Sequence, residues 1–489
     1  MQANILIIMS SSQEIKKRAI NSILWSSVEH FSAQGLGFII TLFIARLVTP
    51  EDYGLIAMLS IFMVVSQVII NSGFSNYLIQ NKNRTHVDYS TVFCLNIVLG
   101  LLCYLILFLS SNGIASFYNQ PLLSDVIKIY GLSLIVSSLT LVQKAILYIN
   151  GEFKRLSVIT IISLFISGTI AIVLAYNSWG VWALVVYYLL QSSTSSIGIW
   201  LTTKWYPTFV FSLQSAKAAF LFGSKLLAAN LLSNAVTNIY TLVIGKQYQA
   251  LELGFYSRGQ SFAMIFPANI SNMLQQATYP ILCELQNDKR RLMDMFEKYL
   301  RISAFVCFPV MTLLISLGEP AIKIILTEKW LSAVFFVQIL GVAYMFDPIM
   351  RLNVIILSVT GKTQLSLYSE IWKKIVLVAI LFITLPWGIK WVASGVVIYS
   401  LMDLFIVTRY VRNIIPITLR RELWIIAPYF VYCIIIYLIV VVVSVLLPND
   451  FMKIVVGVPL GGVVYLLLVK FFSTSSFNNM VVTLKTLKR

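Results

Sequence analysis

One arginine and three amides share a face of a stretch apolar enough to cross a membrane. At helical spacing, the residues that fall within about 60° of one another are Arg258, Asn269, Asn272 and Gln276. An arginine inside a membrane costs at least about 2.5 to 3.5 kcal/mol unless it is solvated or paired. Its guanidinium offers several donors to phosphate oxygens, and Glu29 is the natural acidic counterpart elsewhere in the chain. We expect this face to line a cavity that takes an anionic group, the alternative being an Arg258 side chain that reaches the outer interface.

A second polar stripe occurs twice, 200 residues apart. The first copy consists of Ser27, His30, Gln34 and Thr41. The second copy consists of Asn230, Asn234, Thr237, Asn238 and Thr241. At this offset His30 aligns with Asn230, and Gln34 aligns with Asn234. Hydrogen bonding between helices explains any one of these residues equally well, but two matched stripes favour two helix faces that border one cavity.

No pattern for catalysis or metal binding accompanies these faces in the sequence. It contains no nucleophile motif, no phosphate-cradling glycine loop and no cluster of metal ligands. Its two histidines, His30 and His86, are too few and too far apart to suggest a metal centre. The five cysteines lie in or at the ends of apolar runs without metal-like spacing. We therefore expect neither an enzyme nor a bound cofactor.

The elements that must carry these side chains are membrane-spanning helices. The chain has 489 residues, of which 59% are hydrophobic and 11% charged, and its mean hydropathy is +0.87. Apolar runs of about twenty residues, the length that crosses a bilayer, recur about fourteen times. They lie near residues 21–47, 52–79, 89–110, 124–148, 156–176, 180–203, 216–244, 252–282, 299–317, 332–358, 365–385, 391–410, 422–447 and 452–472. The sequence predicts an all-α polytopic membrane protein.

Basic residues alternate between the loops in a way that predicts orientation. If the amino terminus is cytoplasmic, the loops and termini on its side carry 23 of the 36 lysines and arginines, the opposite side carries 6, and 7 lie in or beside spans. Cytoplasmic loops carry the excess of positive charge. We expect both termini in the cytoplasm, and the net charge of +17 needs no nucleic-acid partner to explain it.

The stretch from Ile39 to Gly54 returns as Ile239 to Gly254, with Ile, Thr, Leu, Ile and Gly at matching places. It is predicted to end one apolar helix and begin another, with Thr49 as cap, Pro50 at the first position and Gly54 leaving little bulk at the turn. Because spans one to six and seven to twelve share an orientation, the repeat is parallel. The expected parts are an N-terminal lobe (1–204), a cytoplasmic linker (205–215), a C-terminal lobe (216–412), and two further helices with a cytoplasmic tail (413–489).

Short motifs over most of the chain are shared with one family of membrane proteins. In the first half they are the Leu47–Gly54 turn, Gly73-Phe74, Leu78-Ile79-Gln80, and Ser90-Thr91-Val92-Phe93 with Asn96. In the second half they are Phe222-Gly223, Ile244-Gly245-Lys246, Leu253 to Arg258, Lys329-Trp330 and Gly361-Lys362. The chain thereby resembles the polysaccharide transporter family, the Wzx-like flippases within the multidrug, oligosaccharidyl-lipid and polysaccharide exporter superfamily. It departs from that family at Tyr148-Ile149-Asn150, where an arginine is common, and at Tyr240, where an acidic residue is common.

The resemblance implies two six-helix lobes forming a V around a central cavity, like the multidrug (MATE) exporters, in a bacterial inner membrane. It implies a flippase that moves an undecaprenyl-pyrophosphate-linked oligosaccharide, a repeat unit of O-antigen, capsule or exopolysaccharide, across the membrane by alternating access. Its partners would be that substrate, membrane lipids and other glycan assembly proteins. An ion-coupled small-molecule exporter is the alternative and predicts a smaller, more apolar or anionic cavity. A glycan polymerase would need a large outer loop, whereas the outer loops here are short.

Overall fold

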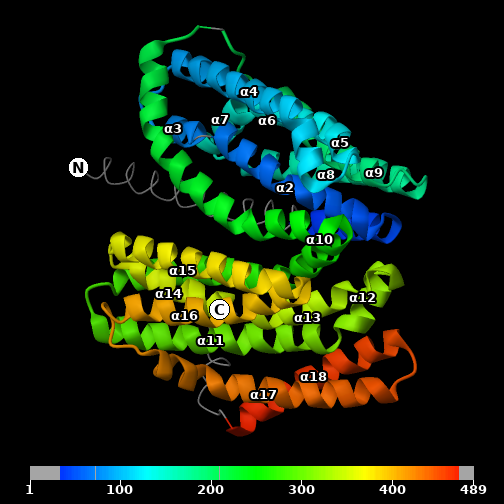
Figure 1. The fold of residues 1–489 in the computed structure, drawn as a ribbon. Coiled ribbons are helices and arrows are strands. Elements are labelled where there is room, and N and C mark those ends of the chain that lie inside the picture. The colour runs from blue at the N-terminus through cyan, green and yellow to red at the C-terminus, as the bar shows by residue number, and fades with distance from the viewer. Residues whose placement is uncertain (1–33, 72, 209, 473–489) are drawn as a thin grey trace. The chain divides into compact units, whose positions relative to one another are not determined.

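The computed structural model describes residues 34–71, 73–208 and 210–472 (Figure 1). All regular elements in these ranges are helical. Nine of the described helices are long and apolar enough to cross a membrane, or up to ten if a bent pair, Leu122–Ser138 with Leu141–Ile149, forms one span. The predicted class, an all-α polytopic membrane protein, is confirmed. The described residues form two compact units, one ending at Gly254 (unit 1) and one beginning at Phe255 (unit 2).

Unit 1 is built from helices that pack mainly against their neighbours in sequence. It contains a helix over Gln34–Leu47 and then α2 (Pro50–Asn71), α3 (Phe74–Gln80), α4 (His86–Tyr118), α5 (Leu122–Tyr130), α6 (Leu132–Ser138), α7 (Leu141–Ile149), α8 (Phe153–Tyr176), α9 (Val181–Thr202) and the first part of α10 (Leu213–Glu284). Helix α4 packs against α5 and α6, α8 against α9, and α3 against α7. Helices α3 and α7 therefore lie side by side, and both contribute to the hollow described below.

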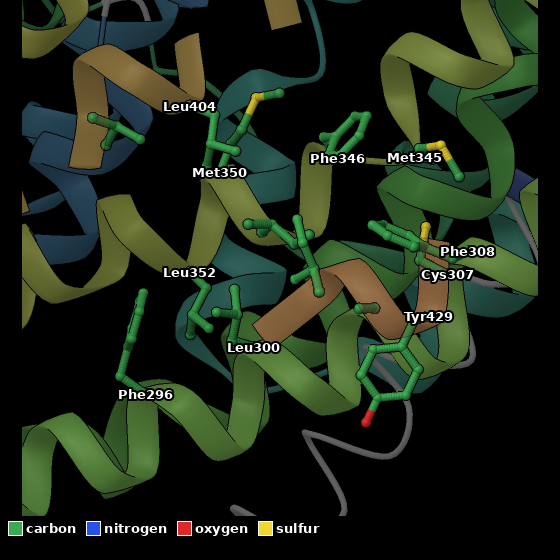
Figure 2. Packing of buried hydrophobic residues seen from close by; sticks show 14 of the residues in the cluster. Phe296, Leu300, Cys307, Phe308, Met345, Phe346, Met350, Leu352, Leu404 and Tyr429 are labelled. Atoms are coloured by element: carbon green, nitrogen blue, oxygen red, sulfur yellow. The ribbon is translucent and has the colours of Figure 1, made fainter. Parts of the chain in front are cut away.

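Unit 2 contains the rest of the chain that the structure describes. Its elements are the second part of α10, α11 (Lys289–Ser316), α12 (Gly318–Leu326), η1 (Glu328–Trp330), α13 (Ala333–Tyr344), α14 (Asp347–Val359), α15 (Thr363–Thr384), η2 (Leu385–Trp387), α16 (Ile389–Val411), α17 (Leu419–Leu446) and α18 (Asp450–Phe472). Its core joins α11, α14, α16 and α17 through buried side chains such as Phe308, Phe346 and Leu404 (Figure 2).

The repeated stretch breaks a helix in both of its copies, as predicted. In the first copy α2 begins at Pro50, and the backbone N–H of Asp52 donates to Thr49 Oγ1 at 3.2 Å. In the second copy α10 changes direction at Gln249, the residue at the position of Thr49, where φ is +70°. Residues other than glycine rarely adopt this φ, and it is not helical, so the helix is interrupted at this residue. We call residues 213–248 the first arm of α10 and residues 250–284 its second arm.

The two copies of the repeat meet through their backbones. A Cβ at Gly54 would overlap the carbonyl of Ala250, and a Cβ at Gly254 would overlap the carbonyl of Pro50. These contacts are equivalent under the 200-residue offset, because Gly54 corresponds to Gly254 and Pro50 to Ala250. Gly54 was predicted to serve a tight turn, but it lies within α2, and what it permits is this close approach.

The first arm of α10 packs on the helices that precede it. Ala219 lies in a buried cluster with Phe74 and Phe93, and the ring of Phe222 lies 6.1 Å from that of Tyr77. The boundary between the compact units therefore falls after this arm, whereas the predicted lobe boundary lies at 205–215 and remains a prediction.

Candidate functional site

A polar hollow of 490 Å³ lies in unit 1. Side chains from α7, from the first arm of α10, from α3 and from the end of α2 line it; the polar ones are Asn71, Ser75, Asn76, Lys144, Tyr148, Asn230 and Asn234. We call this space the unit 1 hollow. Four asparagines and a lysine at one place in so apolar a chain suggest a site for a polar ligand.

Glycine at position 73 brings the walls of the unit 1 hollow together. Gly73 connects α2 to α3 with a φ of +71°, which glycine adopts readily. A Cβ there would lie 3.2 Å from the Cα of Gly223 and equally close to Leu226, on the first arm of α10. The absence of a side chain therefore lets the first arm approach the turn that carries Asn71 and Asn76.

Lys144 supplies the positive charge that lines the hollow. Its side chain is half-buried, and Nζ lies 6.0 Å from the ring centroid of Tyr148, one turn further along α7. The ammonium is a compact point charge suited to phosphate, and carboxamides both donate to and accept from hydroxyl groups. Chemically, the lining matches an anionic ligand that also carries hydrogen-bonding groups.

The predicted stripe of the second repeat contributes two residues to the hollow. Asn230 and Asn234 line it, and Asn234 Nδ2 donates to the Asn230 carbonyl at 2.8 Å. Asn238 Nδ2 donates to the Asn234 carbonyl at 2.8 Å, but Asn238 is not part of the lining. These bonds to the preceding turn hold the amides along one side of the helix.

The other predicted stripe, in the first copy of the repeat, is described only from Gln34 onward. Glu29 and His30 fall outside the described residues. Gln34, the first described residue of the chain, has an exposed side chain and does not line the unit 1 hollow. The alignment of the two stripes therefore remains a prediction.

The arginine face on the second arm of α10 divides between two environments. Arg258 is buried, with 6% of its surface exposed, and its Cζ lies 5.8 Å from the ring centroid of the fully buried Trp330. Asn272 and Gln276 instead line a separate, open hollow of 400 Å³. Asn269 is half-buried, and its Nδ2 donates to the Ile265 carbonyl at 2.7 Å. The structure therefore brings two of the four predicted side chains to one hollow.

Unit 2 also holds charged groups on neighbouring helices. The predicted pair of Arg351 and Asp347 is confirmed, with Nε 3.5 Å from Oδ2, and Ser271 donates to the same carboxylate at 2.6 Å. Lys373, which is 4% exposed, lies 2.9 Å from Asp403 and 3.1 Å from Glu370. Ser271 thereby links α10 to α14, and Lys373 links α15 to α16.

Lys144 is the functional candidate that the sequence prediction missed. It is one of two lysines in the apolar run at 124–148, and the other, Lys128, pairs with Asp125 near the start of that run. The reasoning applied to Arg258 applies to Lys144 equally well. Asn71 and Asn76 carried no such signal, because asparagines near the end of a helix are common and only the fold brings them to Lys144.

Comparison with known proteins decides the family. A family model described as "Polysaccharide biosynthesis protein" matches residues 43–335, more than half of the chain. The chain belongs to this family. The teichuronic acid biosynthesis protein TuaB of Bacillus subtilis is 25% identical over 73% of this chain and 74% of TuaB. The lipopolysaccharide biosynthesis protein WzxC of Escherichia coli is 24% identical over 67% of each chain. The resemblance seen in the sequence motifs is confirmed.

Solved structures show the same fold at low sequence identity. A structure titled "Lipid II flippase MurJ, inward closed conformation" matches with a TM-score of 0.74 and 16% identity, covering 93% of this chain and 99% of that one. An inward-facing multidrug resistance transporter of the MATE family matches with a TM-score of 0.61 and 14% identity, covering 80% and 97%. The family member described here is a multi-pass membrane protein with a MurJ- and MATE-like fold.

Proposed function

We propose that this protein is a flippase that carries an undecaprenyl-pyrophosphate-linked oligosaccharide across the bacterial cytoplasmic membrane by alternating access. The observation that carries the proposal is the unit 1 hollow, where Lys144 and four asparagines converge inside an apolar helical unit. The names of the relatives support it, since WzxC is a lipopolysaccharide biosynthesis protein and MurJ a flippase of lipid II.

Fourteen spans in two parallel six-helix lobes, followed by two further helices, remain our proposal for the topology. Its support comes from elements beyond the nine or ten apolar helices. The break at Gln249 gives α10 two arms, each long enough to cross a bilayer. Helices α9 and α15 occupy two more predicted spans, and the helix over Gln34–Leu47 occupies part of the first. Both termini are then cytoplasmic, as the distribution of basic residues predicts.

The unit 1 hollow lies near the helix ends that this topology assigns to the cytoplasm. Asn71 and Gly73 precede the basic loop at Lys82 and Arg84, and Tyr148 precedes Lys154 and Arg155. A lipid-linked repeat unit made on that side would meet Lys144 first. The amides would take the sugar, while the polyprenyl tail stays in the bilayer. Arg258, together with the amides of its helix face, is the proposed later contact for the pyrophosphate.

The test is export of surface glycan in cells that lack their own transporter, normalised to the amount of protein in the membrane. Wild-type protein should restore export, and Lys144→Gln should lower it at least about tenfold, because one lost charge-assisted contact of roughly 1.5 to 3 kcal/mol accounts for that factor. Lys144→Arg should retain part of the activity, since the charge survives.

The matched control is Lys128→Gln on α5. Nζ of Lys128 lies 3.3 Å from Asp125 Oδ1, and Lys128 does not line the hollow. It should export normally. Export that is unaffected by Lys144→Gln would remove the hollow from the transport path. If the protein instead lowers the accumulation of small cationic compounds and never restores glycan, the ion-coupled exporter becomes the better description.

A further inference from the structure

A fully buried carboxyl group lies in unit 2 at the start of α17. Thr418 caps this helix by accepting from the backbone N–H of Arg421, and Glu422 follows in the first turn. Glu422 is 0% exposed. Its carboxyl group lies against Asn353 of α14, also 0% exposed, and against Thr408 of α16, which is 2% exposed. Three helices therefore meet at this side chain.

The hydrogen bonds around Glu422 leave two acceptors facing apolar surroundings. Asn353 Nδ2 donates to Glu422 Oε2 at 3.2 Å and to the Ile349 carbonyl at 3.1 Å. Glu422 Oε1 and Asn353 Oδ1 are both buried, and neither has a hydrogen-bond partner among the described residues. The Thr408 hydroxyl donates to the Leu404 carbonyl at 2.7 Å, so its single proton is already used. This site has more acceptors than donors.

Several charged groups on the surrounding helices are paired with residues other than Glu422. Arg421 lies 2.6 Å from Glu297 of α11, and Arg301 approaches the same carboxylate at 3.7 Å. On α14 and α16, Arg351 pairs with Asp347 and Asp403 pairs with Lys373.

Other charged groups on the packed elements are exposed, among them Asp294 and Lys298 on α11. Arg409 and Arg412 at the end of α16, Arg420 on α17 and Lys470 on α18 are exposed. The hydroxyl of Tyr465 on α18 donates to the Phe305 carbonyl at 2.8 Å. Among the ion pairs between described residues, none includes Glu422, which leaves no cation to balance a carboxylate there.

A proton is the smallest change that satisfies these groups. Burying an ionised carboxylate without a cation is costly, and the neutral acid is favoured instead. A protonated Oε1 becomes a donor, and the Asn353 Oδ1 or Thr408 oxygen can accept from it. We propose that Glu422 is a proton-binding site, which stays occupied while α17 is packed against α14 and α16 and can release its proton only when water enters between these helices.

This site would make export depend on pH, a step that rests on the proposed function. Any transport movement that separates α17 from α14 would release the proton, and closure would require it again. Glu422→Gln keeps the shape and the hydrogen-bonding capacity of the neutral acid but cannot release a proton. Export by this variant should therefore lose its dependence on cytoplasmic pH.

Infrared spectroscopy of the full chain in lipid bilayers tests the proton directly. Wild-type protein should show a carbonyl band of a protonated carboxyl group that is lost in Glu422→Gln and displaced in Glu422→Asp. The matched control is Glu297→Gln, since that carboxylate is paired with two arginines and should contribute only to the ionised band. Two results would overturn the proton site. One is that Glu422→Gln loses intensity from the ionised carboxylate band and not from the protonated carbonyl band. The other is that adding sodium shifts the protonated carbonyl band of the wild-type protein.

The two levels of the proposal fail separately. The band requires no transport, so a protonated Glu422 in a protein that never exports glycan refutes the proposed function and leaves the proton site intact. Conversely, export whose pH profile is identical in wild type and Glu422→Gln refutes the coupling. If Glu422→Gln does not accumulate in the membrane, the displaced band of Glu422→Asp still decides protonation.

Discussion

At the scale of single residues, Arg258 shows how burial changes the meaning of a charge. The sequence places it on a polar face, but the structure packs its guanidinium against Trp330 while Asn272 and Gln276 line an open hollow. A cation over an indole ring contributes about 0.5 to 2 kcal/mol, and more where the pair is desolvated. Arg258 therefore contributes to packing in unit 2 as well as to any contact with substrate.

We expect Arg258→Gln to lower export strongly while the protein still inserts, because removing an intramembrane charge does not penalise insertion. Arg258→Lys should retain part of the activity, since the charge remains but the planar fork is lost. Glu29→Gln should have the smaller effect if it only pairs with the arginine. The measurement is glycan export per membrane-inserted protein. Trp330→Leu serves as the control for packing: if it reproduces the loss with Arg258 intact, the arginine acts by holding unit 2 together.

A second residue-scale prediction concerns the buried lysine on α15. Lys373→Met removes the cation between Asp403 and Glu370 and leaves a buried carboxylate, which should destabilise unit 2 by roughly 3 to 5 kcal/mol. The double variant Lys373→Met with Asp403→Asn should recover much of that loss, because no unbalanced charge remains at Asp403. Thermal unfolding in detergent would measure both, and equal unfolding temperatures for Lys373→Met and wild type would contradict the role of the pair.

At the scale of elements, the two copies of the repeat approach each other closely at Gly54 and Gly254, where a larger residue would not fit. A Cβ at Gly54 or at Gly254 meets backbone atoms of the other copy, which cannot rotate away as a side chain does. Gly54→Ala and Gly254→Ala should each separate α2 from the break in α10 and abolish most export. Gly113→Ala and Gly462→Ala are the matched controls, because a Cβ at either position meets nothing within 4 Å.

Cysteine cross-linking can follow this separation. In a variant without the five native cysteines, pairs placed beside the contact should cross-link readily in an otherwise wild-type chain and slowly with Gly54→Ala. Full export by both alanine variants would show that the close approach is dispensable.

The local features of these elements could be predicted from the sequence. Thr49, Pro50 and the break near residue 249 follow from capping chemistry and from the repeat, both of which depend on neighbours in the chain. The partner of Gly54 could not be predicted, because Ala250 lies about 200 residues away and only packing brings the two together. Lys144 and Asn71 meet Asn230 for the same reason, and the amphipathic spacing of one helix carries no information about which helices will lie opposite.

At the scale of the whole molecule, orientation is the testable property. The proposed topology puts the loop at Asp288 to Arg291 in the cytoplasm and the segment from Glu319 to Trp330 outside. Single cysteines at positions 289 and 329, in a variant without the native five, should react with an impermeant reagent from opposite sides. Both positions are exposed in the structure, so accessibility does not limit the reaction. Labelling of both from outside intact cells would reverse or refute the orientation.

The contact between Gly54 and Ala250 also limits how the chain could recover from damage. Because a Cβ at Gly54 meets the carbonyl of Ala250 and not its methyl group, no replacement at position 250 makes room for Gly54→Ala. A genetic selection for restored glycan export by Gly54→Ala should therefore return few second-site changes at the contact itself. The compensating changes should fall where the path of the backbone can shift, at Gln249 and its neighbours, so that the position of suppressors along the chain would mark the hinge of α10.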